Sequence, residues 1–273
     1  MSERAGRDEK LTPQGSIIWY ELMTSEAAAA ERFYGELVGW RFATHPGATA
    51  AGGAYRLLSA PDAPVGGMME VDGDMNQAGG RPLWVAYFAV DDVDASAERL
   101  VGAGGRLLMG PLDLPGVGRV ALAADPFGAV FYIMRPTPPP GEDGAQSRSF
   151  DEEAIGHCAW NELTTTDLQG ALAFYGDQFG IAKGDTMPMG EMGDYQFIHH
   201  GGRMIGGAMQ GAHPDQPRGW THYFRVPSID SAQAKLEAGG GTILAGAHQV
   251  PGGDWVLICV DPQGARFGLT GAR

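Results

Sequence analysis

The alternation of apolar and polar positions at the start of the chain predicts a strand, a helix and three more strands. The first strand covers residues 16–22, and Thr24 or Ser25 then offers an N-cap for a helix that runs to about Val38. Glycine and proline turns separate the segments that follow. The three further strands are expected near 40–44, 53–59 and 63–71.

The same order of elements returns from residue 83. A strand at 83–90 leads into a helix at 92–102, and strands are expected near 105–109, 117–124 and 129–135. Side chains alternate across a strand, and in "WVAYFAV" and "AVFYIM" both sets of alternating positions are apolar. We therefore expect helices to cover one face of the sheet and a closed pocket to form on the other.

This whole pattern occurs twice. The segment "WYELMTSEAAAAERFYGELVGW" (19–40) matches "WNELTTTDLQGALAFYGDQFGI", which starts 141 residues later at Trp160. From Trp84 the offset settles at 136 residues, so that "RVALAADPFGAVFYI" matches "WVLICVDPQGARFGL". The chain is therefore a tandem duplication with four βαβββ modules.

The duplication sets the domain organisation. We expect a disordered tail at 1–14, one domain at 15–136, a proline-rich and acidic linker at 137–154, and a second domain at 155–273. The predicted fold class is α+β, with two tandem domains that each pair two βαβββ modules into a curled mixed sheet around a cavity.

Composition narrows the class of protein. The chain has 273 residues, of which 44% are hydrophobic and 19% charged, as is typical of a globular protein with real cores. A net charge of -14 argues against a nucleic-acid or anionic-membrane surface. We find no membrane-spanning run and no signal peptide, and expect a cytoplasmic protein whose Cys158 and Cys259 are reduced and buried.

The repeated motifs resemble a known family. The four modules, the "FYxxxxG" helix ends, and the "DPxG" turns at Asp125 and Asp261 resemble the vicinal oxygen chelate superfamily, which includes glyoxalases, bleomycin-resistance proteins and extradiol dioxygenases. The duplicated Trp-x-Glu-Leu start is most similar to a two-domain actinobacterial subgroup that includes a mycobacterial culture-filtrate antigen and Streptomyces proteins labelled hydroxylases. The resemblance covers about residues 15–136 and 155–271. It implies a glyoxalase-like fold but no single activity, because this fold hosts unrelated chemistries.

The resemblance also implies where a metal would be held. Metal-dependent members use His, Gln or Glu side chains on the cavity face. The matching positions here are Trp19, Val85 and Tyr132 in the first domain and Trp160, Thr221 and Gly268 in the second. None of these is a suitable ligand for a hard or borderline cation, so the sequence predicts no metal and no cofactor.

Other potential donors lie close to these positions without filling them. His222 is displaced by one residue and is expected to face the helices, and His157 is expected on the opposite side of its strand from Trp160. Glu70 and Gln210 lie near a fourth ligand position of the family, where one oxygen donor alone does not hold a metal.

The candidate catalytic residues are Glu21 and Glu162. Each lies two residues beyond a tryptophan, Trp19 or Trp160, and therefore on the same face of the strand. A carboxylate among apolar side chains has a raised pKa and could act as a general acid or base. The alternative is a structural glutamate that accepts hydrogen bonds from backbone or tyrosine donors.

Strand alternation predicts two pockets of different character. The first contains no cation and suits an apolar or aromatic ligand; its expected lining is Trp19, Glu21, Val85, Tyr87, Val130, Tyr132 and Met134. The second contains arginines that could pair with the glutamate or bind an acidic ligand; its expected lining is Trp160, Glu162, Thr221, Tyr223, Arg225 and Arg266. The methionine-rich segment 185–195 is either a flexible lip over the second pocket or ordinary rim packing.

Two functions follow from these residues. One is a metal-independent protein that binds a small apolar or aromatic molecule, in sequestration, resistance or secondary metabolism. The other is a lyase, isomerase or hydroxylase/dioxygenase-like enzyme that uses Glu21 or Glu162 as acid or base. The aromatic residues at the expected ligand positions favour the first. The expected partner is a small molecule, with no nucleic acid and no membrane, and the chain is expected to be a monomer or homodimer.

Overall fold

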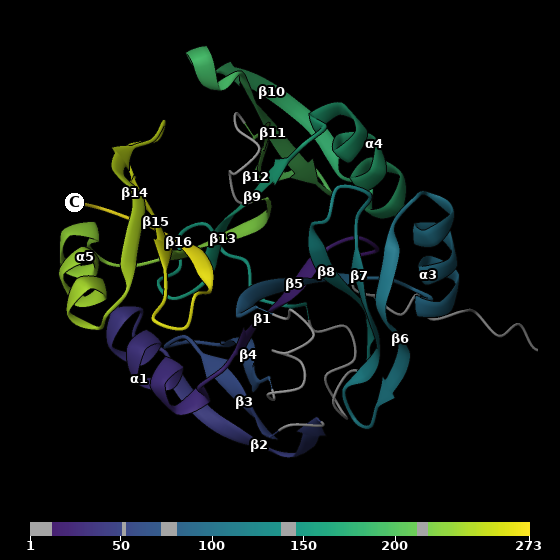
Figure 1. The fold of residues 1–273 in the computed structure, drawn as a ribbon, viewed down its shortest axis with the longest axis horizontal. Helices are drawn as coiled ribbons and strands as arrows, with labels where there is room; N and C mark the ends of the chain where they lie inside the picture. The colour runs from purple at the N-terminus through teal and green to yellow at the C-terminus, as the bar shows by residue number, and fades with distance from the viewer. Residues whose placement is uncertain (1–12, 51–52, 72–80, 138–145, 212–217) are drawn as a thin grey trace, which may run out of the picture.

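The structure, a computed structural model, describes residues 13–50, 53–71, 81–137, 146–211 and 218–273. The predicted tail lies almost entirely outside these ranges, and so does much of the predicted linker. Two eight-stranded mixed sheets are formed, one from each half of the sequence (Figure 1). The strand order is β2-β3-β4-β1-β5-β8-β7-β6 in the first sheet and β10-β11-β12-β9-β13-β16-β15-β14 in the second. Because the two orders are equivalent, the α+β glyoxalase-like fold expected from the sequence is confirmed.

The elements of the first domain follow the βαβββ order twice. The first module consists of β1 (Ile17–Thr24), α1 (Ala27–Leu37), β2 (Arg41–Ala50), β3 (Gly53–Ser59) and β4 (Pro64–Glu70). The second consists of β5 (Leu83–Ala89), α3 (Val93–Gly102), β6 (Arg106–Leu114), β7 (Gly118–Ala124) and β8 (Val130–Pro136).

The second domain repeats this order with one additional short helix. Its first module consists of β9 (Cys158–Thr165), α4 (Leu168–Phe179), β10 (Ala182–Pro188), η1 (Gly190–Met192), β11 (Asp194–His200) and β12 (Arg203–Gln210). Its second consists of β13 (Gly219–Arg225), α5 (Ile229–Ala238), β14 (Thr242–Gln249), β15 (Trp255–Val260) and β16 (Arg266–Gly271).

The first strands of paired modules lie side by side at the centre of each sheet. In the first sheet β1 and β5 are antiparallel, with Glu21 opposite Val85. In the second sheet β9 and β13 are antiparallel, with Glu162 opposite Thr221. Both candidate glutamates are therefore held by two neighbouring strands rather than by a loop.

The predicted N-cap of the first helix is wrong by one or two residues. Thr24 ends β1, and the helix begins after Glu26, whose side chain makes no capping hydrogen bond. The N–H of Ala27 instead donates to Oε2 of Glu70 at 2.9 Å. A carboxylate from β4 thus accepts one of the free N–H groups of the first helical turn and lies at the positive end of the helix dipole.

The helix-bearing faces of the two sheets pack against each other. One core cluster joins Phe33 of α1 to Leu236 of α5 and Phe267 of β16. A second joins Phe131 of β8 to Phe179 of α4. Figure 1 accordingly has α1 beside α5 and α3 beside α4. The face of each sheet that carries helices is therefore completed by the other domain, and the two domains share their cores.

Hydrogen bonds between the repeated motifs cross this interface. The indole N–H of Trp84 donates to the hydroxyl of Tyr34 at 2.9 Å, and that hydroxyl donates to Oδ2 of Asp261 at 3.0 Å. Asp261 belongs to the second domain, and its Oδ1 accepts the backbone N–H groups of Gln263 and Ala265. A helix motif of one domain is thereby tied to a turn motif of the other.

The mirror arrangement occurs at the other cluster. Trp220 donates to Tyr175 at 2.9 Å, and Tyr175 donates to Oδ2 of Asp125 in the first domain at 3.1 Å. We call these two chains the Trp–Tyr–Asp relays. They give the repeated Phe-Tyr and Asp-Pro motifs a structural role, because each relay satisfies buried polar groups that would otherwise lack partners.

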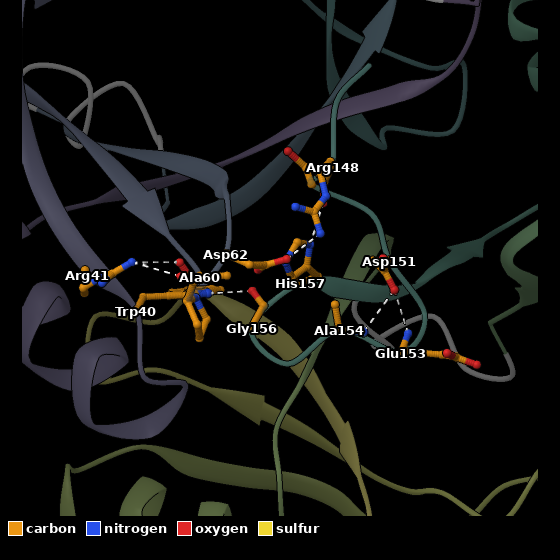
Figure 2. Close-up of polar contacts among 12 residues, drawn as sticks. Trp40, Arg41, Ala60, Asp62, Arg148, Asp151, Glu153, Ala154, Gly156 and His157 are labelled. Carbon is orange, nitrogen blue, oxygen red and sulfur yellow. Dashed lines mark hydrogen bonds and ion pairs between the residues drawn. The ribbon is translucent and has the colours of Figure 1, made fainter. Parts of the chain in front are cut away.

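The chain between the domains is anchored to the first domain at a turn after β3 (Figure 2). The carboxylate of Asp62 contacts Arg148, and its Oδ1 lies 2.8 Å from Nε2 of the buried His157. The indole N–H of Trp40 donates to the carbonyl of Gly156 at 2.7 Å. These contacts fix the entry into β9, the strand that carries Glu162.

The opposite, helix-free face of the first sheet carries a third apolar cluster. Val85, Tyr87 and Ala89 lie in this cluster, whereas Ala86 and Phe88 lie in the cores shared between domains, so the predicted alternation along β5 is confirmed. Its buried members are Ile18, Met23, Val71, Val85, Tyr87, Ala89, Val120, Tyr132 and Met134. No comparable apolar cluster forms on the helix-free face of the second sheet within the described residues.

Cys158 and Cys259 are free thiols and buried, as predicted. Within the described ranges, every helix is too short or too polar to cross a membrane.

Candidate functional site

Glu21 lies at the centre of the apolar helix-free face and is 2% exposed. The hydroxyl of Tyr87 donates to its Oε2 at 2.8 Å. The indole N–H of Trp19 donates at 3.0 Å to the hydroxyl of Tyr55, which lies close enough to Glu21 to favour its ionised form. Oε1 of Glu21 is buried, and Tyr55 is the second tyrosine, after Tyr87, whose hydroxyl acts on this carboxyl group.

Burial raises the pKa of Glu21 to about 7, and the hydrogen bonds from Tyr87 and Tyr55 only partly oppose this shift. A carboxylate is disfavoured in surroundings of low polarity unless a cation or several donors compensate for the lost water. Among the described residues no charged group contributes to the shift. Near neutral pH, Glu21 therefore exchanges between a carboxylate and a neutral acid.

Aromatic rings flank this carboxyl group. The rings of Tyr87 and Tyr132 stack with their centroids 4.2 Å apart and their planes inclined by 18°. Trp19 and Val130 are half-buried beside them, and Met134 is buried. The structure thus brings the residues predicted for the first pocket to one face, around an acid that has no cationic partner among the described residues.

Glu162 occupies the equivalent position in the second domain with both oxygens satisfied. Tyr195 donates to its Oε2 at 3.0 Å and Tyr223 donates to its Oε1 at 3.1 Å. Trp160 donates to the hydroxyl of Tyr195 at 2.8 Å. Burial raises the pKa of Glu162 as well, while the two tyrosines and the positive charge of Arg266 lower it.

Tyr55 and Tyr195 were not found by sequence reasoning. They come from β3 and β11, and their rings cross the adjacent strand at a glycine: a Cβ at Gly67 would lie 1.8 Å from the Tyr55 hydroxyl, and one at Gly207 would lie 2.1 Å from the Tyr195 ring. Gly67 is in register with Glu21. The repeated "VGGMME" and "IGGAMQ" segments were therefore the available signal, because a glycine on a central strand marks the close approach of another group.

The structure corrects the predicted role of Arg225. This arginine was expected beside Glu162, but its guanidinium contacts Asp254 and donates from Nε to the carbonyl of Glu152. The acceptors lie on the β14–β15 turn and on the chain preceding β9, where strand alternation alone could not place them. Of the two predicted arginines, Arg266 is the one whose charge acts on Glu162.

The remaining predicted residues of the second pocket also lie differently from their counterparts in the first. Thr221 is fully buried beneath the site. Gly268 lies under the ring of Tyr223: a Cβ added at Gly268 would lie 2.2 Å from Cδ1 of Tyr223. Tyr223 thus covers the position where the first domain has the second ring of its stacked pair, Tyr132.

The residues at the family's metal positions do not fit a metal. Trp19, Val85 and Tyr132 surround Glu21 but supply no imidazole or carboxylate, and the described residues contain no group of three His, Cys, Asp or Glu side chains that could hold an ion. His222 faces the core between the domains, as predicted, with Nδ1 2.9 Å from Oδ1 of Asn161. Burial lowers its pKa to about 3, so it is a neutral core residue.

One surface cavity among the described residues lies away from both glutamates. It has a volume of about 420 Å³ and lies between α3 and the end of α4, lined in part by Asp92, Arg99 and Phe179. Its lining comes from both domains and includes neither Glu21 nor Glu162. The methionine-rich segment forms the end of β10 and η1, where Met192 is half-exposed.

Comparison with known proteins agrees with this architecture. The family model described as "Glyoxalase/Bleomycin resistance protein/Dioxygenase superfamily" matches residues 16–133 and 154–269. CFP32 of Mycobacterium tuberculosis is 30% identical over 259 residues, which cover 94% of each chain. The anthracycline biosynthesis protein DnrV of Streptomyces peucetius is 30% identical over 277 residues, covering 95% of this chain and 94% of the relative.

Solved structures show the same fold. The Mn(II)-bound glyoxalase from Novosphingobium aromaticivorans superposes with a TM-score of 0.62 and 19% identity, covering 96% of this chain and 83% of that chain. At this level of identity the likeness concerns the fold alone. With both halves matched by the family model and the relatives aligned over nearly their full length, the chain belongs to the glyoxalase/bleomycin resistance protein/dioxygenase superfamily.

Proposed function

We propose that the protein binds a small, uncharged aromatic or apolar molecule on the helix-free face of its first domain, without a metal ion. The observation that carries this proposal is the apolar cluster around Glu21, with the stacked rings of Tyr87 and Tyr132. A binding face built from aromatic and aliphatic side chains with one placed polar group is typical of small-molecule sites. The name of the relative DnrV, an anthracycline biosynthesis protein, supports a ligand from small-molecule metabolism.

A second candidate function is acid–base catalysis by Glu21. A carboxyl group with a pKa near neutrality can both accept and release a proton at working pH, which is what a general acid or base requires. The two candidates separate in one experiment. If Glu21→Gln preserves ligand affinity but abolishes a measured turnover, the protein is an enzyme.

Protein purified without chelators is expected to contain far less than one equivalent of Fe, Mn, Ni, Co or Zn per domain. The reason is that the side chains at the family's ligand positions lack the donors that these cations prefer. Elemental analysis checks this, with a metal-dependent glyoxalase purified in parallel as the positive control. About one equivalent of a metal per domain would refute the metal-independent part of the proposal.

Fluorene, a planar uncharged hydrocarbon, is expected to bind once per chain with a Kd on the order of 10 µM, given about 0.5 kcal/mol for each of its non-hydrogen atoms. Isothermal titration calorimetry measures both quantities. The chain offers a matched pair of variants, because Val130 of the first domain corresponds to Arg266 of the second. Val130→Arg places a cation beside Glu21, in the position from which Arg266 acts on Glu162, and is expected to weaken binding at least roughly tenfold, because a hydrocarbon that covers this ion pair removes its water.

Arg266→Val is the control for this experiment and is expected to leave fluorene affinity within about twofold, because it lies in the other domain. Both variants are compared by circular dichroism and thermal unfolding to check that they are folded. Absence of binding, or equal binding by the folded Val130→Arg variant, would contradict the proposed location of the site.

A further inference from the structure

We infer that the buried imidazole of His157 holds the chain between the two domains to the first domain only while both of its ring nitrogens carry protons. The ring lies directly before β9 and is 0% exposed. Its Nδ1 lies within hydrogen-bond distance of the carbonyl oxygen of Arg148, and its Nε2 lies 2.8 Å from Oδ1 of Asp62. Figure 2 shows the ring beside both groups, and we call this set of contacts the His157 clasp.

The two partners determine the protonation state that the ring needs. A carbonyl oxygen and a carboxylate oxygen only accept hydrogen bonds, so both ring nitrogens must donate. A neutral imidazole carries a proton on one nitrogen alone, and either tautomer would place the lone pair of the other nitrogen against an oxygen. The His157 clasp is therefore complete only in the imidazolium form.

The charges around the ring favour a cation. The hydrogen bond from His157 holds the pKa of the Asp62 carboxyl below its usual range, and Arg148 lowers it further, so this group stays ionised. A second carboxylate, Asp151, lies nearby; the backbone N–H of Glu153 lowers its pKa, and the charge of His157 adds to this effect. The guanidinium of Arg148 contacts Oδ2 of Asp62, the oxygen that the ring does not use.

The other charged groups packed near the ring have partners of their own. From β13, Arg225 donates its backbone N–H to the carbonyl of His157, while its guanidinium contacts Asp254. From β2, the guanidinium of Arg41 donates to backbone carbonyl groups of the turn after β3. Within the described residues, the polar contacts of the imidazole are thus those with Asp62 and Arg148.

The His157 clasp joins separate parts of the chain. Asp62 lies in the turn that links β3 to β4, and these strands form the hairpin that supplies Tyr55 to the Glu21 site. Arg148 and His157 lie on the chain that leads into β9. When the ring loses a proton, one of its two hydrogen bonds is replaced by repulsion between lone pairs, so the hairpin and this chain are held less firmly. The shared cores keep the domains joined.

The His157 clasp is expected to weaken as the pH rises. It is complete at low pH, where imidazole is protonated, and is lost through the range in which histidine side chains titrate, ordinarily about pH 6.5. Asp62 is ionised throughout this range, so the change comes from the ring. Because a charge-assisted hydrogen bond is lost, local opening of the chain before β9 is expected to become about tenfold more frequent.

Hydrogen exchange of backbone amides, followed by mass spectrometry on the full chain at pH 5.5 and pH 8.0, tests this expectation. After correction for the pH dependence of chemical exchange, residues 146–157 of the wild-type protein are expected to exchange about tenfold faster at pH 8.0. His157→Phe fills the same buried space without N–H groups. It is expected to exchange at both pH values at least as fast as the wild type at pH 8.0.

Asp62→Asn makes the opposite prediction. Its amide can accept from a protonated Nε2 or donate to a neutral one, so the contact no longer needs the second proton. This variant is expected to exchange slowly at both pH values, with a difference of less than about twofold. His248→Gln, at an exposed position of β14, is the control and should behave as the wild type. Glu21, whose pKa is about 7, is present in every protein compared, so its titration affects all of them alike.

Two results would overturn the inference. One is equal corrected exchange of residues 146–157 in the wild-type protein at the two pH values. The other is a pH difference in Asp62→Asn as large as that of the wild type, which would show that the change arises elsewhere. Asp62 has a partly exposed side chain, so this variant decides the question even if His157→Phe does not fold.

Discussion

Glu21→Gln is expected to stabilise the folded protein at pH 8 by about 3 kcal/mol and to have little effect at pH 4. The pKa of Glu21 is raised from 4.5 to about 7 by burial. As the pH rises from about 4.5 to 7, the unfolded chain releases this proton and the folded chain retains it, so the folded state loses stability over that window. The loss is complete above pH 7 and corresponds to about 1.4 kcal/mol for each unit of the shift.

Gln is a permanently neutral replacement of nearly the same shape, and it therefore lacks this pH-dependent cost. Urea denaturation of wild-type and variant protein at pH 4, 6 and 8 measures the effect as a difference in the free energy of unfolding. Glu162→Gln is the matched comparison and is expected to gain less at pH 8, because two tyrosines and Arg266 already stabilise the anion. A gain at Glu21 that is the same at all three pH values would contradict the assigned burial of its charge.

Breaking both Trp–Tyr–Asp relays is expected to destabilise the protein by about 5 kcal/mol. Tyr34→Phe leaves the indole N–H of Trp84 and Oδ2 of Asp261 without their partner in a buried site, which costs about 2–3 kcal/mol. Tyr175→Phe does the same at the other relay. The two relays lie in different core clusters, so their effects should add.

A pair of double-mutant cycles tests this account. Tyr34→Phe combined with Trp84→Phe should show a coupling energy of at least about 1 kcal/mol, because the second substitution removes a donor that the first had left unpaired. Tyr34→Phe combined with Trp220→Phe should show almost none. Since the domains share their cores, all variants are also expected to unfold in a single transition. Separate transitions for the two domains would contradict the shared-core description.

The faces of the central strands could be predicted from the sequence because side-chain alternation is a local property of a strand. That rule assigned Val85 and Tyr87 to the helix-free face and Ala86 and Phe88 to the opposite one, and the structure agrees. The duplicated register likewise placed Glu21 and Glu162 in equivalent sites. These successes depend only on periodicity and on the comparison of one half of the chain with the other.

What could not be predicted depends on contacts between distant segments. Three such contacts are the capping of α1 by Glu70, the pairing of Arg225 with Asp254, and the contact of Tyr55 with Gly67. Each joins segments that are distant in the sequence, and the periodicity of apolar residues gives no information on such pairs. The shared core is of the same kind, since nothing in the pattern of one half indicates that its helices will face those of the other. Long-range packing decided each of these features.

Two strands are also longer than predicted, and both are edge strands. The strand near 40–44 continues to Ala50 as β2, and the strand near 105–109 continues to Leu114 as β6. Each runs through a proline and glycine pair that otherwise indicates a turn, and each has an irregular register with its single neighbour. An edge strand tolerates proline because one side of its backbone needs no partner, so the turn signal was misleading there.

Two equivalent domains, each built from a pair of modules, are joined here in one chain. This removes a restriction on sequence change that a symmetric dimer would impose. In a dimer of identical subunits every substitution appears twice, so both sites change together. Here the two relays that join the domains contain the same residue types in both copies. At the site, by contrast, Val130 and Tyr132 of the first domain correspond to Arg266 and Gly268 of the second. Assembly and recognition are thereby uncoupled, and each half can acquire its own chemical preference without loss of the common scaffold.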